Sequence, residues 1–368
     1  MVTPPFAGAF AGRRVLVTGH TGFKGSWLSE WLLGLGAEVH GLALAPDTTP
    51  SLFAILGLER RLASHRIVDV RDGAAVAATV AAVRPEVVLH LAAQPLVRLS
   101  YREPAATWAT NVQGTVHLLE ALRAVPGCRA CVVVTSDKCY ENREQVWGYR
   151  ESDAMGGHDP YSSSKGAAEL AVASWRRSFF STPDAMRLAS GRAGNVIGGG
   201  DWSADRIVVD FVAAIAAGRT LHLRNPLATR PWQHVLEPLS GYLWLAARLL
   251  GGDGARFADG WNFGPADASV TTVKELADRL VAAWGSGSVA CAGNAGQPHE
   301  AGLLKLDVSK AAAHLGWRGI WDVSRTAAET VAWYRSHHLG GADLADLTRR
   351  QIAAYTADAR AAGLAWTR

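Results

Sequence analysis

The stretch that decides the fold is RVLVTGHTGFKGSW, residues 14–27. Its first five residues are mostly β-branched or apolar, which is typical of a buried strand. Three glycines follow with the spacing GxxGxxG, where a helix is expected to begin; they allow a tight turn, close approach to a pyrophosphate and close helix packing. The N–H groups of that helix end can bind phosphate oxygens. The stretch therefore predicts a dinucleotide-binding loop, contributed by Gly19, Thr21, Gly22, Phe23, Lys24 and Gly25.

Outward from this loop, short apolar runs alternate with helical stretches as far as about residue 191. Strands are expected at 14–18, 39–44, 66–70, 87–91, 131–135 and 186–189, and helices at 23–35, 74–83, 105–125 and after Pro160. This alternation predicts an α/β fold, a doubly wound parallel sheet of Rossmann type covered on both faces.

The rhythm breaks after residue 191, where glycine and proline become frequent. We expect a flexible lead over residues 1–11 and a dinucleotide-binding domain over 12–191. Residues 192–368 are expected to form a smaller, mainly substrate-binding domain, with a strand near 261–263 returning to the main sheet.

Composition excludes several classes of protein. The 368 residues are 49% hydrophobic and 19% charged, as in ordinary globular proteins, and the net charge of +4 is too dilute to indicate nucleic-acid binding. No apolar run reaches the roughly 18 residues of a membrane helix, and the N-terminus lacks a secretory pattern, so we expect a cytoplasmic protein. Cys128 and Cys131 form a CxxC without a second cysteine pair, so no metal site is expected.

A tyrosine and a lysine form the first candidate catalytic pair. Tyr161 and Lys165 are four residues apart in a helix that begins at Pro160, so both side chains share one face. An ammonium beside a phenol favours the phenolate, which would lower the pKa of Tyr161 and make it a base for a sugar hydroxyl.

A second candidate group, Ser136-Asp137-Lys138, follows the strand expected at 131–135. Ligands of open parallel sheets bind at the carboxyl ends of the strands. A hydroxyl, a carboxyl and an amine in succession supply a hydrogen-bond donor, a general acid and a base. Lysine is rare in this chain, which has only six, and three of them fall in these motifs: Lys24, Lys138 and Lys165.

Over nearly its whole length the chain resembles the extended short-chain dehydrogenase/reductase family. The resembling features are TGxxGFxG, Asp69-Val70, the HLAAQ stretch that contains Leu91, Ala92, Ala93 and Gln94, Asn111, and YxxxK. Within the family it is most similar to the CDP-glucose 4,6-dehydratases, because other sugar-nucleotide dehydratases carry Thr-Asp-Glu where this chain has Ser136-Asp137-Lys138. The resemblance implies bound NAD, a CDP-glucose substrate, and a homodimer or homotetramer.

The resemblance also implies site roles. Tyr161, with Lys165 and Ser136, would take the proton of the glucose 4-hydroxyl; Lys138 would act at carbon 5, and Asp137 would protonate the departing 6-hydroxyl. Candidate cofactor contacts beyond the glycine loop are Asp69, Val70, Leu91, Ala92, Ala93, Tyr161 and Lys165. Candidate substrate contacts are Gln94, Asn111, Arg192, Asn195 and Arg230, while His299, Lys305 and Lys310 lie in a family-like stretch without an assigned role.

Three alternatives remain open from the sequence. The expected second strand ends without an acidic residue, and Asp47 is the nearest one, so charge does not choose between NAD and NADP. The chain could be another sugar-nucleotide dehydratase or an epimerase acting on a different nucleotide. A third alternative is a non-catalytic Rossmann sensor, although such a protein has no need for YxxxK together with Ser136.

Overall fold

The computed structural model describes residues 3–266, 269–291 and 302–368. Across these residues, seven strands form one parallel sheet in the order β11-β6-β5-β4-β1-β2-β3. The strands are β1 (Arg14–Thr18), β2 (Glu38–Ala43), β3 (Ser64–Ile67), β4 (Val87–His90), β5 (Ala130–Val134), β6 (Arg187–Ala193) and β11 (Gly260–Phe263). The predicted Rossmann-type sheet is confirmed, and the strand expected near 261–263 returns to it beside β6.

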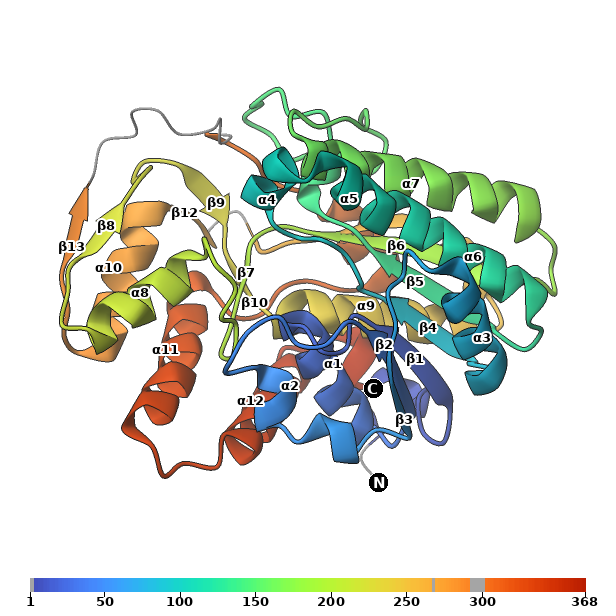
Figure 1. The fold of residues 1–368 in the computed structure, drawn as a ribbon, viewed down its shortest axis with the longest axis horizontal. Helices are drawn as coiled ribbons and strands as arrows, with labels where there is room; N and C mark the ends of the chain where they lie inside the picture. Colours follow the sequence, from blue (N-terminus) through green and yellow to red (C-terminus); the bar gives the residue numbers. More distant parts are fainter. Residues whose placement is uncertain (1–2, 267–268, 292–301) are drawn as a thin grey trace.

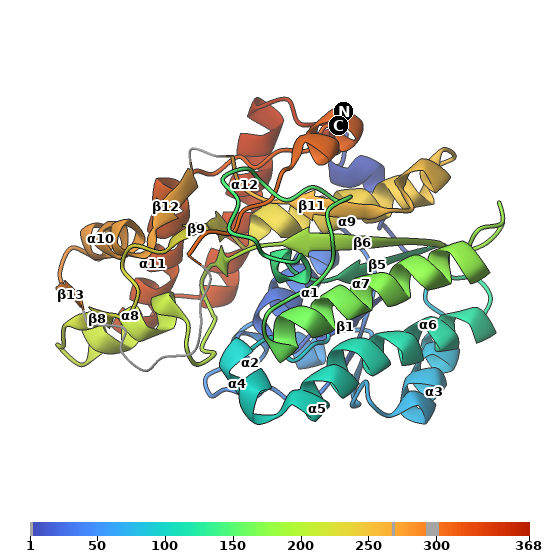
Figure 2. The ribbon, with the colours of Figure 1, turned by 90° about the horizontal axis from the view of Figure 1, so that it is seen from above.

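Helices cover both faces of this sheet (Figures 1 and 2), because the central strands β1, β4 and β5 are apolar and buried on both sides. Helices α3, α6 and α7 cover one face, together with α4 and α5. Their bounds are Gly73–Val83, Gly114–Ala124, Pro160–Phe179, Val97–Arg102 and Pro104–Trp108. The other face packs against α1 (Phe23–Gly34) and α9 (Leu236–Leu250). The helix α12 (Leu344–Ala361) and the short α2 (Leu52–Ile55) lie against α1.

A smaller lobe lies beyond the carboxyl ends of the strands, at the left of Figure 1. It contains α8 (Ile207–Ala216), α10 (Val273–Trp284) and α11 (Val323–Leu339). Three two-stranded sheets accompany them: β7 (Val196–Ile197) with β10 (Gln233–His234), β8 (Leu221–Leu223) with β13 (Val289–Cys291), and β9 (Thr229–Pro231) with β12 (Val270–Thr272).

Local signals explain where the helices begin. Asp159 caps α7 by accepting a hydrogen bond from Ser162 N at 2.9 Å, and Pro160 occupies the first turn, where its missing N–H costs nothing. Thr272 and Glu275 form a capping box at the start of α10. The helix expected over 105–125 is instead divided: α5 and α6 are joined by a π-helical turn at 109–113.

Two expectations about domain limits need correction. The lead over residues 1–11 was expected to be flexible, but in its described part Phe6 and Phe10 are fully buried, and Phe6 stacks on Trp366 at a centroid distance of 4.9 Å. Two aromatic side chains supply the apolar area that anchors this segment beside the C-terminal end. The boundary at 191 falls inside β6, because the strand continues to Ala193.

The described helices include none that is both long and apolar enough to cross a membrane.

Candidate active site

The main cleft, of about 600 Å³, lies between the sheet and the smaller lobe. One wall comes from the glycine loop after β1, the segments that follow β4 and β5, and the first turns of α7. The opposite wall comes from residues 193–232 and from Val273. Every cofactor and catalytic residue predicted from the sequence lines this cleft, and so do Asn195 and Arg230.

The glycine loop has no room for side chains at two of its positions. Gly19 has a φ of +74°, and a Cβ there would lie 2.8 Å from Ala92 N in the segment after β4. A Cβ on Gly25 would lie 2.0 Å from Gly19 O, so α1 could not approach the loop. These contacts explain why a strand, a tight turn and a helix end can pack this closely.

Ser136, Asp137 and Lys138 form a short turn at the end of β5. The Ser136 hydroxyl donates to Asp137 Oδ1 at 3.0 Å and accepts from Lys138 N at 3.2 Å. Asp137 is 3% exposed, and its Oδ2 has no hydrogen-bond partner among the described residues. Burial raises the pKa of Asp137 above its usual value, so the protonated form needed by a general acid is favoured.

Tyr161 and Lys165 project from the first turns of α7 and are both buried. Tyr161 is hydrogen-bonded to the Ser136 side chain. The sequence predicted a lowered pKa for Tyr161, and this is corrected: burial raises the pKa to about 12, although the Ser136 bond and Arg206 oppose the rise. The phenolate therefore depends on positive charge placed beside it.

Two lysines in the cleft are unusual because they are shielded from water: Lys165 is buried and Lys24 is half-buried. Burial lowers the pKa of Lys24 to about 8, with further lowering by Lys165 and Arg206 and an opposing effect of Asp137. Burial also lowers the pKa of Lys165 to about 8, opposed by Glu169 and Cys139. The cleft thus concentrates positive charge around the one buried Asp137 carboxyl.

Three predicted substrate residues do not line the main cleft in the described part of the chain: Gln94, Asn111 and Arg192. Gln94 bonds through its side chain to Leu96 and Thr107. Asn111 accepts from Gln94 N at 2.8 Å and donates to the Ser164 hydroxyl at 2.9 Å. The Gln94 amide therefore joins the segment after β4 to α5, and the Asn111 amide joins the same segment to α7.

Arg192 lies on the α7 side of β6, where it forms an ion pair with Glu169 at 2.8 Å. Its guanidinium also donates to the Tyr140 hydroxyl at 2.6 Å and to Glu151 O at 3.3 Å. Residue type alone suggested a phosphate ligand, but alternation along β6 turns this side chain toward α7.

Most of the second cleft wall could not be recognised from the sequence. Its residues include Trp202, Asp205, Arg206, Ile207, Asp210, Leu221, His222, Leu223, Arg224, Asn225, Trp232 and Val273. They come from separate short elements without a shared motif. Two other tryptophans in this half of the chain, Trp244 and Trp261, are core residues, and their indole N–H groups donate to Leu315 O and Phe257 O.

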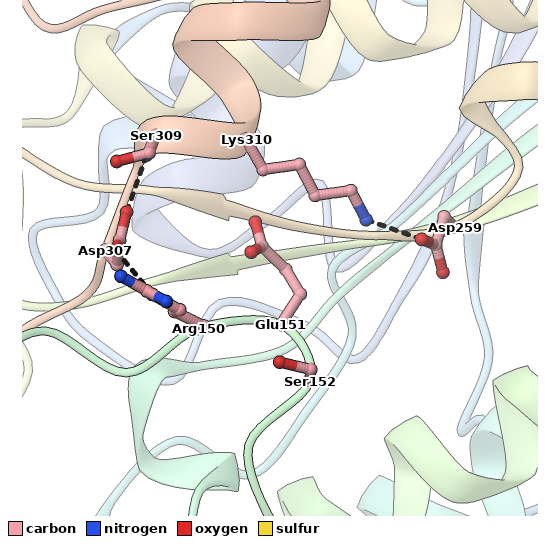
Figure 3. A pocket seen from close by; sticks show the side chains of 7 residues that line it. All are labelled: Arg150, Glu151, Ser152, Asp259, Asp307, Ser309 and Lys310. Carbon is pink, nitrogen blue, oxygen red and sulfur yellow. Dashed lines mark hydrogen bonds and ion pairs between the residues drawn. The ribbon is translucent and has the colours of Figure 1, made fainter.

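A second cavity, of about 480 Å³, lies outside the main cleft (Figure 3). It contains two ion pairs, Lys310 with Asp259 and Arg150 with Asp307, and the Glu151 carboxyl accepts from Asn262 N. Lys310 also lies over the Trp261 ring, 4.5 Å from its centroid, so its contacts are structural. His299 lies outside the described residues. Among the described residues, no group of His, Cys, Asp or Glu is arranged to hold a metal ion.

The sheet, the glycine loop and the paired Tyr161 and Lys165 define a nucleotide-binding α/β enzyme of the short-chain dehydrogenase/reductase type. The chain belongs to the GDP-mannose 4,6-dehydratase family, whose model matches residues 16–330.

Curated relatives and solved structures agree with this assignment. The chain is 50% identical to a CDP-glucose 4,6-dehydratase of Salmonella typhimurium over 348 residues, which cover 94% of this chain and 96% of the relative. A dTDP-glucose 4,6-dehydratase of Streptomyces venezuelae, solved with NAD and TYD bound, has a TM-score of 0.73 and 26% identity, covering 88% of this chain and 97% of that one. A UDP-glucose 4-epimerase of Thermus thermophilus, solved with NAD, has a TM-score of 0.75 and 25% identity, covering 88% and 99%.

Proposed function

We propose that this chain is a lyase that converts CDP-D-glucose to CDP-4-keto-6-deoxy-D-glucose and water, with tightly bound NAD. The observation that carries the proposal is the convergence of Tyr161 and Lys165 with Ser136, Asp137 and Lys138 in one cleft beside the glycine loop. The 50% identity to a CDP-glucose 4,6-dehydratase over most of both chains supports the choice of substrate.

The residues present fit a dinucleotide. Gly22 is exposed at the end of the loop and has no side chain, so the loop backbone can approach a pyrophosphate there. Asp69 and Val70 line the cleft after β3 and would hold the adenosine, and Leu91, Ala92 and Ala93 line it after β4. Bound NAD would supply hydride acceptance at carbon 4 and hydride return at carbon 6. The complex of the Streptomyces venezuelae dehydratase with NAD supports this cofactor.

In the oxidation step, Tyr161 removes the proton of the 4-hydroxyl group. Because burial raises the pKa of Tyr161, the phenolate requires nearby positive charge. Arg206 lowers this pKa, and Lys165 lies one turn further along the same helix face. Ser136 holds the phenol oxygen by a hydrogen bond, which fixes its direction.

In the dehydration step, the ketone at carbon 4 makes the proton on carbon 5 acidic. Lys138 takes that proton, and Asp137 protonates the departing 6-hydroxyl group through its unpartnered Oδ2. Water leaves, and Lys138 returns its proton to carbon 5 when carbon 6 is reduced.

The proton balance requires one more transfer. After a turnover Tyr161 has gained a proton, and Asp137 has lost the one that left in the released water. Ser136 is bonded to both groups, and its hydroxyl donates to Asp137 Oδ1. It is therefore in position to pass a proton from Tyr161 to Asp137 and restore the starting state.

The diphosphate is expected to contact Arg230, with Asn195 near the sugar or diphosphate, since both line the cleft opposite the glycine loop. Assembly into a homodimer or homotetramer is proposed from the family alone. A cytoplasmic location is proposed because all four cysteines are free thiols, as expected in a reducing compartment.

The rival function is 4-epimerisation of a sugar nucleotide, which needs only the tyrosine and lysine. The presence of Asp137 and Lys138 beside them favours dehydration. Incubating the purified protein with CDP-glucose should produce the alkali-labile chromophore of a 4-keto-6-deoxy sugar. Parallel incubations with dTDP-, UDP- and GDP-sugars should produce far less, and a greater rate with one of them would overturn the choice of nucleotide.

A further inference from the structure

Glu169 is a fully buried carboxylate that the proposed reaction does not use. It is on α7, one turn beyond Lys165 and two turns beyond Tyr161, so the three side chains share one face of the helix. Its side chain is only 2% exposed. A carboxylate buried to this degree needs several donors to offset the loss of hydration.

Three side chains donate to it, and together they join three elements. Thr135 Oγ1 donates to Oε1 at 2.5 Å, Ser190 Oγ donates to Oε2 at 2.7 Å, and Arg192 Nη2 donates to Oε2 at 2.8 Å. Thr135 directly precedes Ser136, and the other two donors are on β6. Glu169 thus ties the helix that carries Tyr161 and Lys165 to the strand end that carries Ser136 and Asp137.

The network extends away from the cleft through Arg192. Its guanidinium bonds to the Tyr140 hydroxyl, which in turn donates to Asn262 Oδ1 at 2.8 Å. Asn262 N donates to Glu151 Oε1 at 2.9 Å, and Glu151 lines the second cavity in Figure 3. Arg192 is therefore held from behind and presents its charge to Glu169 rather than to a substrate.

Glu169 also acts electrostatically on Lys165. Burial alone would raise the pKa of Glu169. The positive charge of Arg192 and the hydrogen bonds from Arg192, Thr135 and Ser190 lower this pKa below its usual value, so the carboxylate stays charged. The groups that interact with Lys165 from the surrounding elements are Lys24 on α1, His90 on β4, Cys139 after β5 and Glu169 on α7, and Tyr161 lies one turn before it on α7. Among these, Glu169 is the group that is a fixed anion at neutral pH.

We propose that Glu169 is a positioning residue that keeps the buried Lys165 in its ammonium form and aligns α7 with the catalytic end of β5. The role in turnover rests on the proposed function. Burial lowers the pKa of Lys165, and the negative charge of Glu169 opposes this lowering. Without that charge the pKa of Lys165 would fall further, so the ammonium would lose its proton at a lower pH.

The test compares two substitutions of Glu169, one that removes the charge and one that shortens the side chain. Glu169→Gln keeps the shape but loses the charge, and it presents an amide N–H₂ to a group of donors. Glu169→Asp keeps the charge but shortens the side chain. We expect the alkaline limb of the C4 oxidation rate to move down by about one pH unit in the Gln variant, a roughly tenfold loss above that limb. The Asp variant should keep the wild-type limb while unfolding at a lower temperature.

Further variants separate charge from folding. Glu169→Gln combined with Arg192→Met removes both buried charges, so it avoids leaving an unpaired guanidinium, and it should show the same downward shift. Glu120→Gln, on the exposed face of α6, is the surface control. If neither Gln-containing protein folds, the Asp variant provides the test. The alkaline limb of its C4 oxidation rate must then coincide with that of the wild type.

A second readout keeps this test separate from the substrate assignment. The affinity for NAD, followed by fluorescence from pH 6 to 10, should fall at a lower pH in the Gln variant than in the wild type. If the wild type does not convert CDP-glucose, the proposed function fails while this comparison still tests Glu169. Superimposable pH profiles of the wild type and the Gln variants, or an Asp variant shifted as far as Gln, would overturn the proposal.

Discussion

The two walls of the cleft are built in different ways. The wall that carries the glycine loop and the catalytic turn belongs to the ends of strands that pair in register along their length, such as Val15 with Val39 and Val87. The facing wall comes from two- and three-residue strands and the segments between them, in pairs such as β8–β13 and β9–β12.

This difference separates chemistry from recognition. A long parallel ladder fixes the positions of Ser136, Asp137 and the loop at Gly19 relative to one another, as proton and hydride transfers require. Short strands joined by loops can change without disturbing that ladder, which suits a wall that distinguishes nucleotides. Substitutions in the first wall should therefore affect kcat most, and substitutions in the second should affect KM.

The largest effect is expected from Tyr161→Phe, which removes the base but keeps the ring in its buried position. We expect kcat to fall by about 10³-fold or more, because general base catalysis contributes on that order. Absorbance of the reduced cofactor in a single turnover should show that oxidation itself is lost. A normal oxidation rate in the Phe variant would remove Tyr161 from its assigned role.

Asp137→Asn and Lys138→Ala should affect dehydration more than oxidation. Asparagine cannot donate an acidic proton through the position of Oδ2, and alanine removes the amine, so we expect overall turnover to fall by about 10²-fold or more. The reduced cofactor should accumulate, because oxidation proceeds while the return of hydride waits for elimination. Normal rates of CDP-glucose dehydration in both variants would contradict the assignment.

The sequence predicted the two walls of the cleft to different extents. The glycine loop, the turn at 136–138 and the YxxxK pair are contiguous motifs, and their residues meet because strand ends of a parallel sheet meet. The segment 221–225 carries no such motif, and its place in the cleft depends on pairing with β13, about 70 residues away. The prediction for Arg192 was wrong for a different reason. Its residue type suggested phosphate binding, but the pleat of β6 directs its side chain toward Glu169. The burial that raises the pKa of Tyr161 likewise depends on tertiary packing.

A comparison of two arginines tests the second wall. Arg230 lines the cleft, whereas Arg192 pairs with Glu169 behind it. Arg230→Gln should raise the KM for CDP-glucose by roughly 10- to 100-fold, the scale of a charge-assisted phosphate contact. Arg192→Gln should leave that KM within about threefold but destabilise the fold by roughly 3–5 kcal/mol, because it breaks a buried ion pair. The opposite pattern would exchange their roles.

The smallest catalytic effect is expected at Glu237, which supports the smaller lobe from α9. Its carboxyl accepts from Trp321 N at 2.7 Å and from the Tyr355 hydroxyl at 2.7 Å, so it joins α9 to the segment before α11 and to α12. Burial raises its pKa to about 7, although these hydrogen bonds oppose the rise. Glu237→Gln should change KM only a few-fold, because Glu237 lies behind the cleft wall.

Substitution of Glu237 should change the free energy of unfolding more than it changes catalysis. Because its pKa is higher in the folded protein than in the unfolded chain, its contribution to stability is full below about pH 4.5 and is lost as pH rises toward 7. The free energy of unfolding in urea should therefore fall by up to roughly 3 kcal/mol more in the wild type than in Glu237→Gln between pH 4.5 and 8. Asp278→Asn, on the exposed face of α10 beside Lys274, is the matched control and should follow the wild type. Parallel curves for the wild type and Glu237→Gln would show that the pKa of Glu237 is the same in the folded and unfolded chains, and that burial does not raise it.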